Sequence, residues 1–118
     1  METLTIILNG APYGDEKIYH ALRLTKALLS AAQEMKINIF LLGDAVAAAK
    51  KGQKTPEGFY NLESMLKELI DHGVCVQACR TCIAARGLAE QDLLEGAKIG
   101  TMISLAHWIE ESQKILSF

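Results

Sequence analysis

The chain has 118 residues, 50% hydrophobic and 22% charged, which is enough for one buried core but not for two. This composition, with only two prolines, excludes a disordered or collagen-like chain. The formal net charge of −2, from 12 basic and 14 acidic residues, lacks the basic excess typical of nucleic-acid-binding proteins. We therefore expect a single domain over residues 1–118, with no nucleic acid as its primary partner.

Neither a membrane segment nor a secretion signal is predicted. The apolar run Leu4–Leu8 is too short for a signal peptide, and no apolar stretch approaches the roughly 20 residues that span a bilayer. The three cysteines lie close together, between positions 75 and 82, unlike the disulfide framework of a small secreted domain. We expect a cytoplasmic protein that has no membrane partner.

The first part of the chain has the pattern of a strand, a helix and a second strand. Thr3–Leu8 is almost continuously β-branched or aliphatic, which is typical of a strand buried on both faces of a parallel sheet. After a turn, Asp15 is a candidate cap for a helix whose apolar residues recur at helical spacing as far as Ala32. Lys36–Leu42 predicts the second buried strand.

The middle of the chain predicts two helices that flank an irregular segment. The turn Gly43-Asp44 is expected to cap a short alanine-rich helix over Ala45–Lys50. Lys51–Tyr60 contains two glycines and a proline, so it predicts the least regular and most mobile part of the chain. Asn61 then caps a helix with a clear apolar stripe, which ends at Gly73.

The rest of the chain continues this alternation. In order, the pattern predicts a strand at Val74–Ala78, a short helix at Arg80–Arg86, a turn at Gln91–Leu94, a strand at Ala97–Ile99, a helix striped by Met102, Leu105, Ala106 and Ile109, and a strand at Lys114–Phe118. Alternating strands and helices predict an α/β fold: one three-layer domain whose mostly parallel sheet of about five strands has helices on both faces. Ligands of such sheets bind beyond the carboxyl ends of the strands.

Cys79 is the strongest candidate for a reactive group at that edge. It lies where a predicted strand ends and a helix begins, so free backbone N–H groups, the helix dipole and the nearby Arg80 and Arg86 favour a thiolate. A thiolate is the nucleophile of sulfur chemistry. Cys82 lies one helical turn further on and is expected to act as a resolving or second thiol, whereas Cys75, inside the strand, is expected to be a buried filler.

Other interpretations of the cysteines remain open from the residues alone. A zinc site needs four ligands, and Cys79 and Cys82 supply two, so His72 or a neighbouring subunit would have to contribute the rest. A thioredoxin-type dithiol has the same Cys-x-x-Cys spacing. All three cysteines could also be inert fillers of a core. We expect neither a metal nor another cofactor.

Several short motifs, in order along the whole chain, resemble one known family. They are Asn9-Gly10-Ala11-Pro12-Tyr13-Gly14, Leu42-Gly43-Asp44-Ala45-Val46, Gly52-Gln53-Lys54, Cys79-Arg80-Thr81-Cys82 with Arg86-Gly87, Ile99-Gly100-Thr101 and Lys114-Ile115-Leu116-Ser117-Phe118. Together they look like the DsrE/DsrF-like family, and most of all its YchN-type branch, whose relatives include the sulfur-relay subunits of TusD and DsrE type.

The resemblance implies an α/β sheet and a homo-oligomer, trimeric or hexameric, with sites near subunit interfaces. It also implies that a cysteine accepts sulfane sulfur as a persulfide and passes it on. In the relay subunits that cysteine precedes an Arg-Gly pair, and the ungapped count back from Arg86-Gly87 reaches Cys79. This chain differs from them because Arg80-Thr81-Cys82 replaces the apolar residues that follow their cysteine.

Four further residues are candidates for supporting roles around Cys79. Asn9, Tyr13 and Asp44 follow strands at the same predicted edge, where they could orient a persulfide, an anion or a partner's tail, or could simply form turns and caps. Arg86 is either an electrostatic partner of the thiolate or a cation at a helix end.

The leading hypothesis is a cytoplasmic sulfur-handling protein, a sulfurtransferase-like carrier that takes sulfane sulfur from a donor protein and yields it to an acceptor thiol. In that scheme Cys82 either releases the sulfur or protects Cys79 by forming a disulfide. The alternatives are a non-catalytic oligomeric binding or assembly protein with inert cysteines and a dithiol oxidoreductase.

Overall fold

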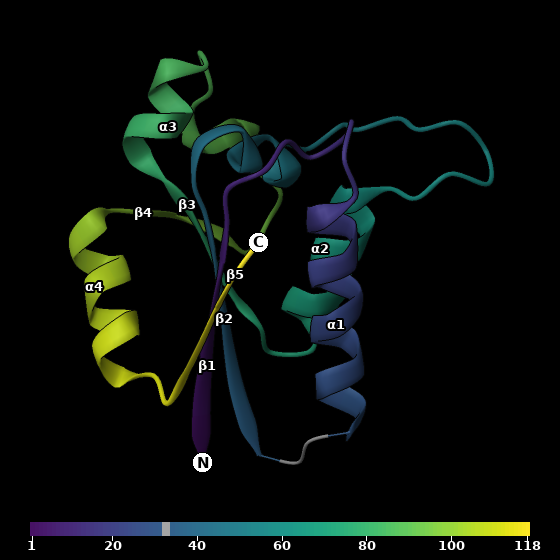
Figure 1. Ribbon diagram of the computed structural model, residues 1–118. Coiled ribbons are helices and arrows are strands. Elements are labelled where there is room, and N and C mark those ends of the chain that lie inside the picture. The colour runs from purple at the N-terminus through teal and green to yellow at the C-terminus, as the bar shows by residue number, and fades with distance from the viewer. Residues whose placement is uncertain (32–33) are drawn as a thin grey trace.

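The computed structural model describes residues 1–31 and 34–118, and these form one five-stranded sheet with the order β4-β3-β2-β1-β5 (Figure 1). Every paired strand is parallel to its neighbour. The elements are β1 Glu2–Leu8, α1 Lys17–Ala31, β2 Met35–Leu41, the 3₁₀ helix η1 Gly43–Ala49, α2 Leu62–Asp71, β3 Cys75–Cys79, α3 Arg80–Ala85, the 3₁₀ helix η2 Glu90–Asp92, β4 Ala97–Gly100, α4 Met102–Glu111 and β5 Lys114–Ser117. The expected continuation of the first helix to Ala32 lies outside the described residues.

Helices cover both faces of this sheet, so the predicted three-layer α/β fold is confirmed. Helices α1 and α2 lie side by side on one face, and α4 lies on the other (Figure 1). The short helices η1 and α3 pack against each other beyond the carboxyl ends of β2 and β3. That edge is where ligands of parallel sheets are expected to bind.

The central strands β1 and β2 are buried on both faces, as their apolar sequences predict. Thr5 and Ile6 of β1 point to opposite faces, and both are fully buried. The end of β2 from Ile37 to Leu41 is likewise buried at every residue. A parallel sheet with two covered faces favours such uninterrupted β-branched and aliphatic sequences.

The predicted helix caps on the α1 and α2 side are confirmed. The Asp15 carboxylate accepts a hydrogen bond from the Lys17 N–H at 2.9 Å, and the Asn61 side chain accepts one from the Ser64 N–H at 3.0 Å. These oxygens satisfy backbone donors that have no partner within the helix. Gly73 adopts a φ of 95° just after α2, a conformation that glycine tolerates and that ends the helix.

Three expectations about local structure are wrong. The alanine-rich segment forms a 3₁₀ helix that begins at Gly43, so Leu42 takes the cap position and has no side chain that can cap, while Asp44 lies in the first turn and binds Arg86. Cys75 is exposed, because the single helix on its face of the sheet leaves it uncovered. On α4 only Leu105 is buried, whereas Met102 and Ile109 of the predicted stripe are exposed.

No helix within residues 1–31 and 34–118 is both long and apolar enough to cross a bilayer.

Gly100 provides a test of how tightly the α4 face is packed. A Cβ atom at this position would lie 2.5 Å from the Gln77 Oε1 atom and 2.6 Å from the Cε2 atom of the buried Phe40. Gly100→Ala should therefore lower the free energy of unfolding by about 1–3 kcal/mol, as overpacked cores do. Urea denaturation at one protein concentration measures this change.

Gly10→Ala is the matched control, because its added methyl group would make only ordinary contacts, at 3.6 Å from Asp15. We expect a change within about 0.5 kcal/mol for this variant. Equal stabilities of the two variants would contradict the close packing at Gly100.

Candidate functional site

The candidate site is built around Cys79, the last residue of β3 and the residue that immediately precedes α3. Gln77, two residues earlier, accepts a hydrogen bond from the Ser104 hydroxyl of α4 at 2.7 Å. Because side chains alternate along a strand, Cys79 points to the same face as Gln77. Cys79 is only 3% exposed, so it lies at the sheet edge but below the surface.

Hydrogen bonds to the Cys79 sulfur favour its thiolate form. The Thr81 hydroxyl lies 3.3 Å from the sulfur. Burial raises the pKa of the Cys79 thiol, but hydrogen bonds from the Thr81 hydroxyl and from the backbone N–H and thiol of Cys82 lower it by more. The pKa of Cys79 therefore lies below that of an ordinary cysteine, although burial acts in the opposite direction.

Cys82 lies one helical turn after Cys79, and the segment that follows β2 contacts its sulfur. Its sulfur accepts a hydrogen bond from the backbone N–H of Gly43 at 3.2 Å. Gly43 begins η1 with a φ of 57°, in the region that favours glycine. The residue after β2 thus contacts the second cysteine of the motif that follows β3.

Arg86 and Asp44 form an ion pair that connects α3 to η1. The Arg86 Nε and Nη2 atoms lie 3.0 Å and 2.7 Å from the same Asp44 oxygen, and Arg86 Nη1 donates to the Cys82 carbonyl at 3.0 Å. The guanidinium therefore binds the end of α3 and the start of η1 rather than the Cys79 sulfur. Of the two roles expected for Arg86, this geometry matches the cation at a helix end.

Two of the predicted supporting residues have partners elsewhere. The Asn9 side chain donates to the Ser117 hydroxyl of β5 at 3.3 Å, so its contacts are with the C-terminal strand. The Tyr13 hydroxyl donates to Gln53 Oε1 at 2.5 Å and accepts from the Leu62 N–H at 2.9 Å. The structure thus brings together Cys79, Cys82, Asp44 and Arg86, and gives Asn9 and Tyr13 structural contacts.

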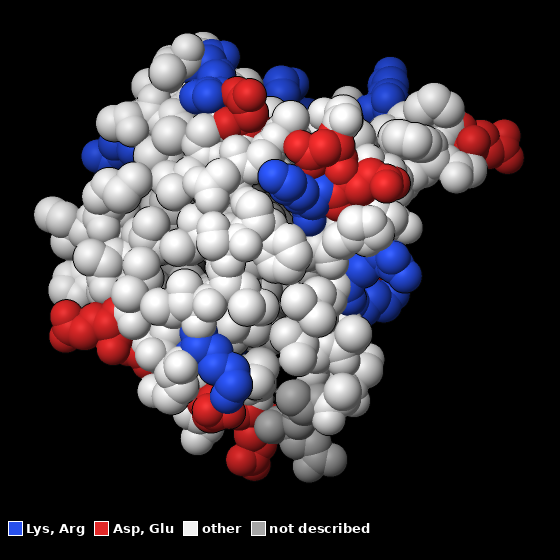
Figure 2. All heavy atoms as spheres, viewed as in Figure 1, with Lys and Arg blue, Asp and Glu red and all other residues white. Residues whose placement is uncertain are grey.

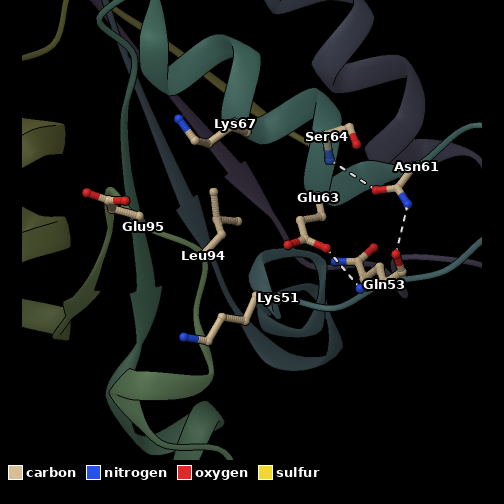
Figure 3. A pocket seen from close by; sticks show the side chains of 8 residues that line it. All are labelled: Lys51, Gln53, Asn61, Glu63, Ser64, Lys67, Leu94 and Glu95. Carbon is tan, nitrogen blue, oxygen red and sulfur yellow. Dashed lines mark hydrogen bonds between the residues drawn. The ribbon is translucent and has the colours of Figure 1, made fainter.

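Gln53 anchors the irregular segment between η1 and α2 and borders a cavity of about 410 Å³ (Figure 3). Its backbone N–H donates to Glu63 at 2.8 Å, and its side-chain amide donates to the Ala48 and Lys50 carbonyls, each at 2.8 Å. The cavity is lined by Lys51, Gln53, Asn61, Glu63, Ser64, Lys67, Leu94 and Glu95. It contains neither cysteine of the candidate site and has charges of both signs.

The zinc interpretation has no support in the geometry. His72 lies before β3, at the end of the strand opposite to Cys79, and its ring nitrogen is 2.8 Å from the Glu68 carbonyl oxygen. Within the described part of the chain, no three histidine, cysteine or acidic side chains come together as metal ligands.

Sequence reasoning missed two contributors to the site, Thr81 and Gly43. Thr81 follows Cys79 by two residues, a spacing at which a hydroxyl at the start of a helix reaches back to the preceding side chain. The sequence predicts Gly43 only as a turn residue, because no sequence pattern shows which side chain a backbone N–H from another strand end will meet. Together these groups can hold a thiolate beside a second thiol.

Comparison with known proteins agrees with this architecture. Residues 2–118 match the DsrE/DsrF-like family. The chain is 41% identical to protein YchN of Escherichia coli over the full length of both, and the crystal structure of YchN superposes on it with a TM-score of 0.94. An uncharacterized protein of Methanocaldococcus jannaschii is 43% identical, with 97% of each chain covered. The chain therefore belongs to the DsrE/DsrF-like family and resembles YchN over its whole length.

Proposed function

We propose that this protein carries sulfane sulfur as a persulfide on Cys79. The Cys79 thiolate attacks the terminal sulfur of a donor persulfide, the new sulfur–sulfur bond forms on Cys79, and the donor leaves as a thiolate. An acceptor thiolate then attacks the terminal sulfur, forms its own persulfide and returns Cys79 to a thiolate. Neither step needs an external oxidant or reductant, because each exchanges one thiolate for another.

The observation that carries this proposal is the set of hydrogen bonds around the Cys79 sulfur. The thiolate is the attacking and leaving species in both steps, and donors from Thr81 and Cys82 stabilise it. The three cysteines are unpaired, as sulfane transfer requires. Free thiols persist in a reducing compartment, so we place this function in the cytoplasm with protein donors and acceptors.

One observation favours the rival function, a binding or assembly protein with inert cysteines. Cys79 is 3% exposed, and buried free cysteines are usually unreactive. The other two cysteines are not buried fillers of the core, since Cys75 is exposed and Cys82 is partly exposed. Reactivity of Cys79 in the folded protein therefore discriminates between the two functions.

We also propose that the protein is a homo-oligomer, because it exposes apolar side chains on two neighbouring elements; the resemblance to the DsrE/DsrF-like family implies a trimer or a hexamer. Met102 and Ile103 of α4 are 58% and 72% exposed, and Ile115 and Leu116 of β5 are exposed as well. Figure 2 shows a wide area over β5 and the adjacent part of α4 with few charged side chains. Large exposed apolar patches are typical of protein interfaces.

Cys79→Ser should abolish sulfur loading, because a serine hydroxyl is not ionised at neutral pH and is a poor nucleophile toward sulfane sulfur. After a brief incubation with a small-molecule persulfide donor, stopped by acid, intact-protein mass spectrometry under non-reducing conditions should show one added sulfur on the wild type and none on this variant. Cys75→Ser is the matched control and should load like the wild type. Equal loading of the two variants would contradict the assignment to Cys79.

The pH dependence of thiol labelling tests the lowered pKa of Cys79. A lowered pKa keeps the thiolate present as pH falls, so iodoacetamide should label Cys79 in the folded chain at pH values below about 8.5, where a free cysteine is mostly protonated. Peptide mapping follows Cys79 itself, and the chain unfolded in urea is the control. Labelling of Cys79 only in the unfolded chain would instead support the inert-cysteine function.

Ile103→Glu should reduce the oligomer mass, because it places a charge in the most exposed apolar position of α4. Size-exclusion chromatography with light scattering measures that mass. Ser64→Glu, which adds the same charge to an exposed position of α2 on the other face of the sheet, is the control and should leave the mass unchanged. A wild-type mass of one chain would refute the oligomer proposal.

A further inference from the structure

The two thiols of the site lie together at the start of α3. Cys79 is the cap residue of this helix and Cys82 is its third residue, two positions whose side chains lie close together at a helix start. The Gly43 N–H donates a hydrogen bond to the Cys82 sulfur at 3.2 Å and holds it at this edge. Cys-x-x-Cys across the start of a helix is also the spacing of dithiols that form a disulfide.

The Asp44–Arg86 ion pair holds Cys82 in this place from two sides. Asp44 follows Gly43, the donor to the Cys82 sulfur, and Arg86 binds both the Asp44 carboxylate and the Cys82 carbonyl. The pair therefore joins the segment after β2 to α3 across the Cys82 residue. Loss of the pair would let the Gly43 N–H and the Cys82 sulfur move apart.

Cys82 also has an advantage over any external acceptor. A separate acceptor thiol must reach Cys79, which is 3% exposed, whereas Cys82 lies in the first turn of the helix that Cys79 caps. Placing two reacting groups together in one molecule replaces a bimolecular encounter by an intramolecular step and can accelerate it by many orders of magnitude.

We propose that the protein has a second activity, which rests on the persulfide-carrier function: Cys82 cleaves the Cys79 persulfide and releases hydrosulfide. The Cys82 sulfur bonds to the Cys79 sulfur, the bond from Cys79 to the terminal sulfur breaks, and the Cys82 thiol proton leaves with that sulfur. Two thiol sulfurs are oxidised to a disulfide while the sulfane sulfur is reduced to hydrosulfide, so the electrons balance. A dithiol reductant then restores both thiols. Asp44 and Arg86 are positioning residues for this step.

A single-turnover experiment tests this activity. The reduced protein is loaded with a small-molecule persulfide donor and rapidly desalted, after which hydrosulfide and protein mass are followed over time without reductant. The wild type should release one hydrosulfide per loaded sulfur and end as a Cys79–Cys82 disulfide, identified by peptide mapping. Cys82→Ser should keep the sulfur on Cys79 and release no hydrosulfide.

Variants of the Asp44–Arg86 ion pair distinguish an effect on the position of Cys82 from an effect on the stability of the fold. Asp44→Asn removes the negative charge that binds Arg86. It should slow hydrosulfide release, per loaded sulfur, by about tenfold, because even small displacements of two reacting groups lower the rate of their reaction. Asp44→Glu keeps the carboxylate and should restore most of the rate. Glu68→Gln is the control, since it removes the exposed Lys26–Glu68 ion pair of 3.0 Å that does not involve the cysteines, and it should release like the wild type.

Two outcomes contradict the proposals in different ways. A wild-type persulfide that is as long-lived as that of Cys82→Ser, with no disulfide formed, overturns hydrosulfide release and leaves the carrier function standing. A Cys82→Ser variant that never gains sulfur, together with a wild type that releases no hydrosulfide, overturns the carrier function and, with it, this second activity.

Discussion

Parallel pairing of β2 with β3 is the constraint on which the candidate site depends. The register places Leu41 opposite Ala78, so both strands end together and the chain leaves each of them at the same edge. Gly43 follows one strand and Cys79 ends the other, which brings a backbone N–H from the first to the cysteine pair of the second. A shift of one residue in this register would turn every β3 side chain to the opposite face and would separate these groups.

Burial and hydrogen bonding have opposite effects on the pKa of Cys79, and the net result is a pKa below that of an ordinary cysteine. Burial destabilises a thiolate, whereas the donors of Thr81 and Cys82 stabilise it by more. A sulfur that is 3% exposed is protected from solvent and from large reagents, while a neighbouring thiol reaches it without entering from outside. This combination is what the proposed persulfide carrier, with release of its sulfur by a second cysteine, requires.

The face of the sheet that holds α4 contrasts with the face covered by α1 and α2. Two helices pack side by side on one face, whereas α4 alone covers the other and leaves Cys75 and its own Met102 and Ile103 exposed. Cys79 points to this less covered face. The proposed oligomer interface and the proposed sulfur site therefore involve the same side of the molecule, so association of subunits would affect the surroundings of the cysteines.

The sequence by itself determined the alternation of strands and helices, the parallel sheet and the edge at which the cysteines lie, because these follow from local periodicity, caps and turns. Tertiary structure alone decided the partners at that edge: Asp44 binds Arg86 rather than capping a helix, Tyr13 binds Gln53, and Gly43 meets Cys82. It also decided that Cys75 and the Met102 and Ile109 positions of the α4 stripe are exposed. The physical reason is that hydrophobic pattern identifies which side chains favour burial, but the contacts between strand ends and the extent of each covered face depend on how distant segments pack together.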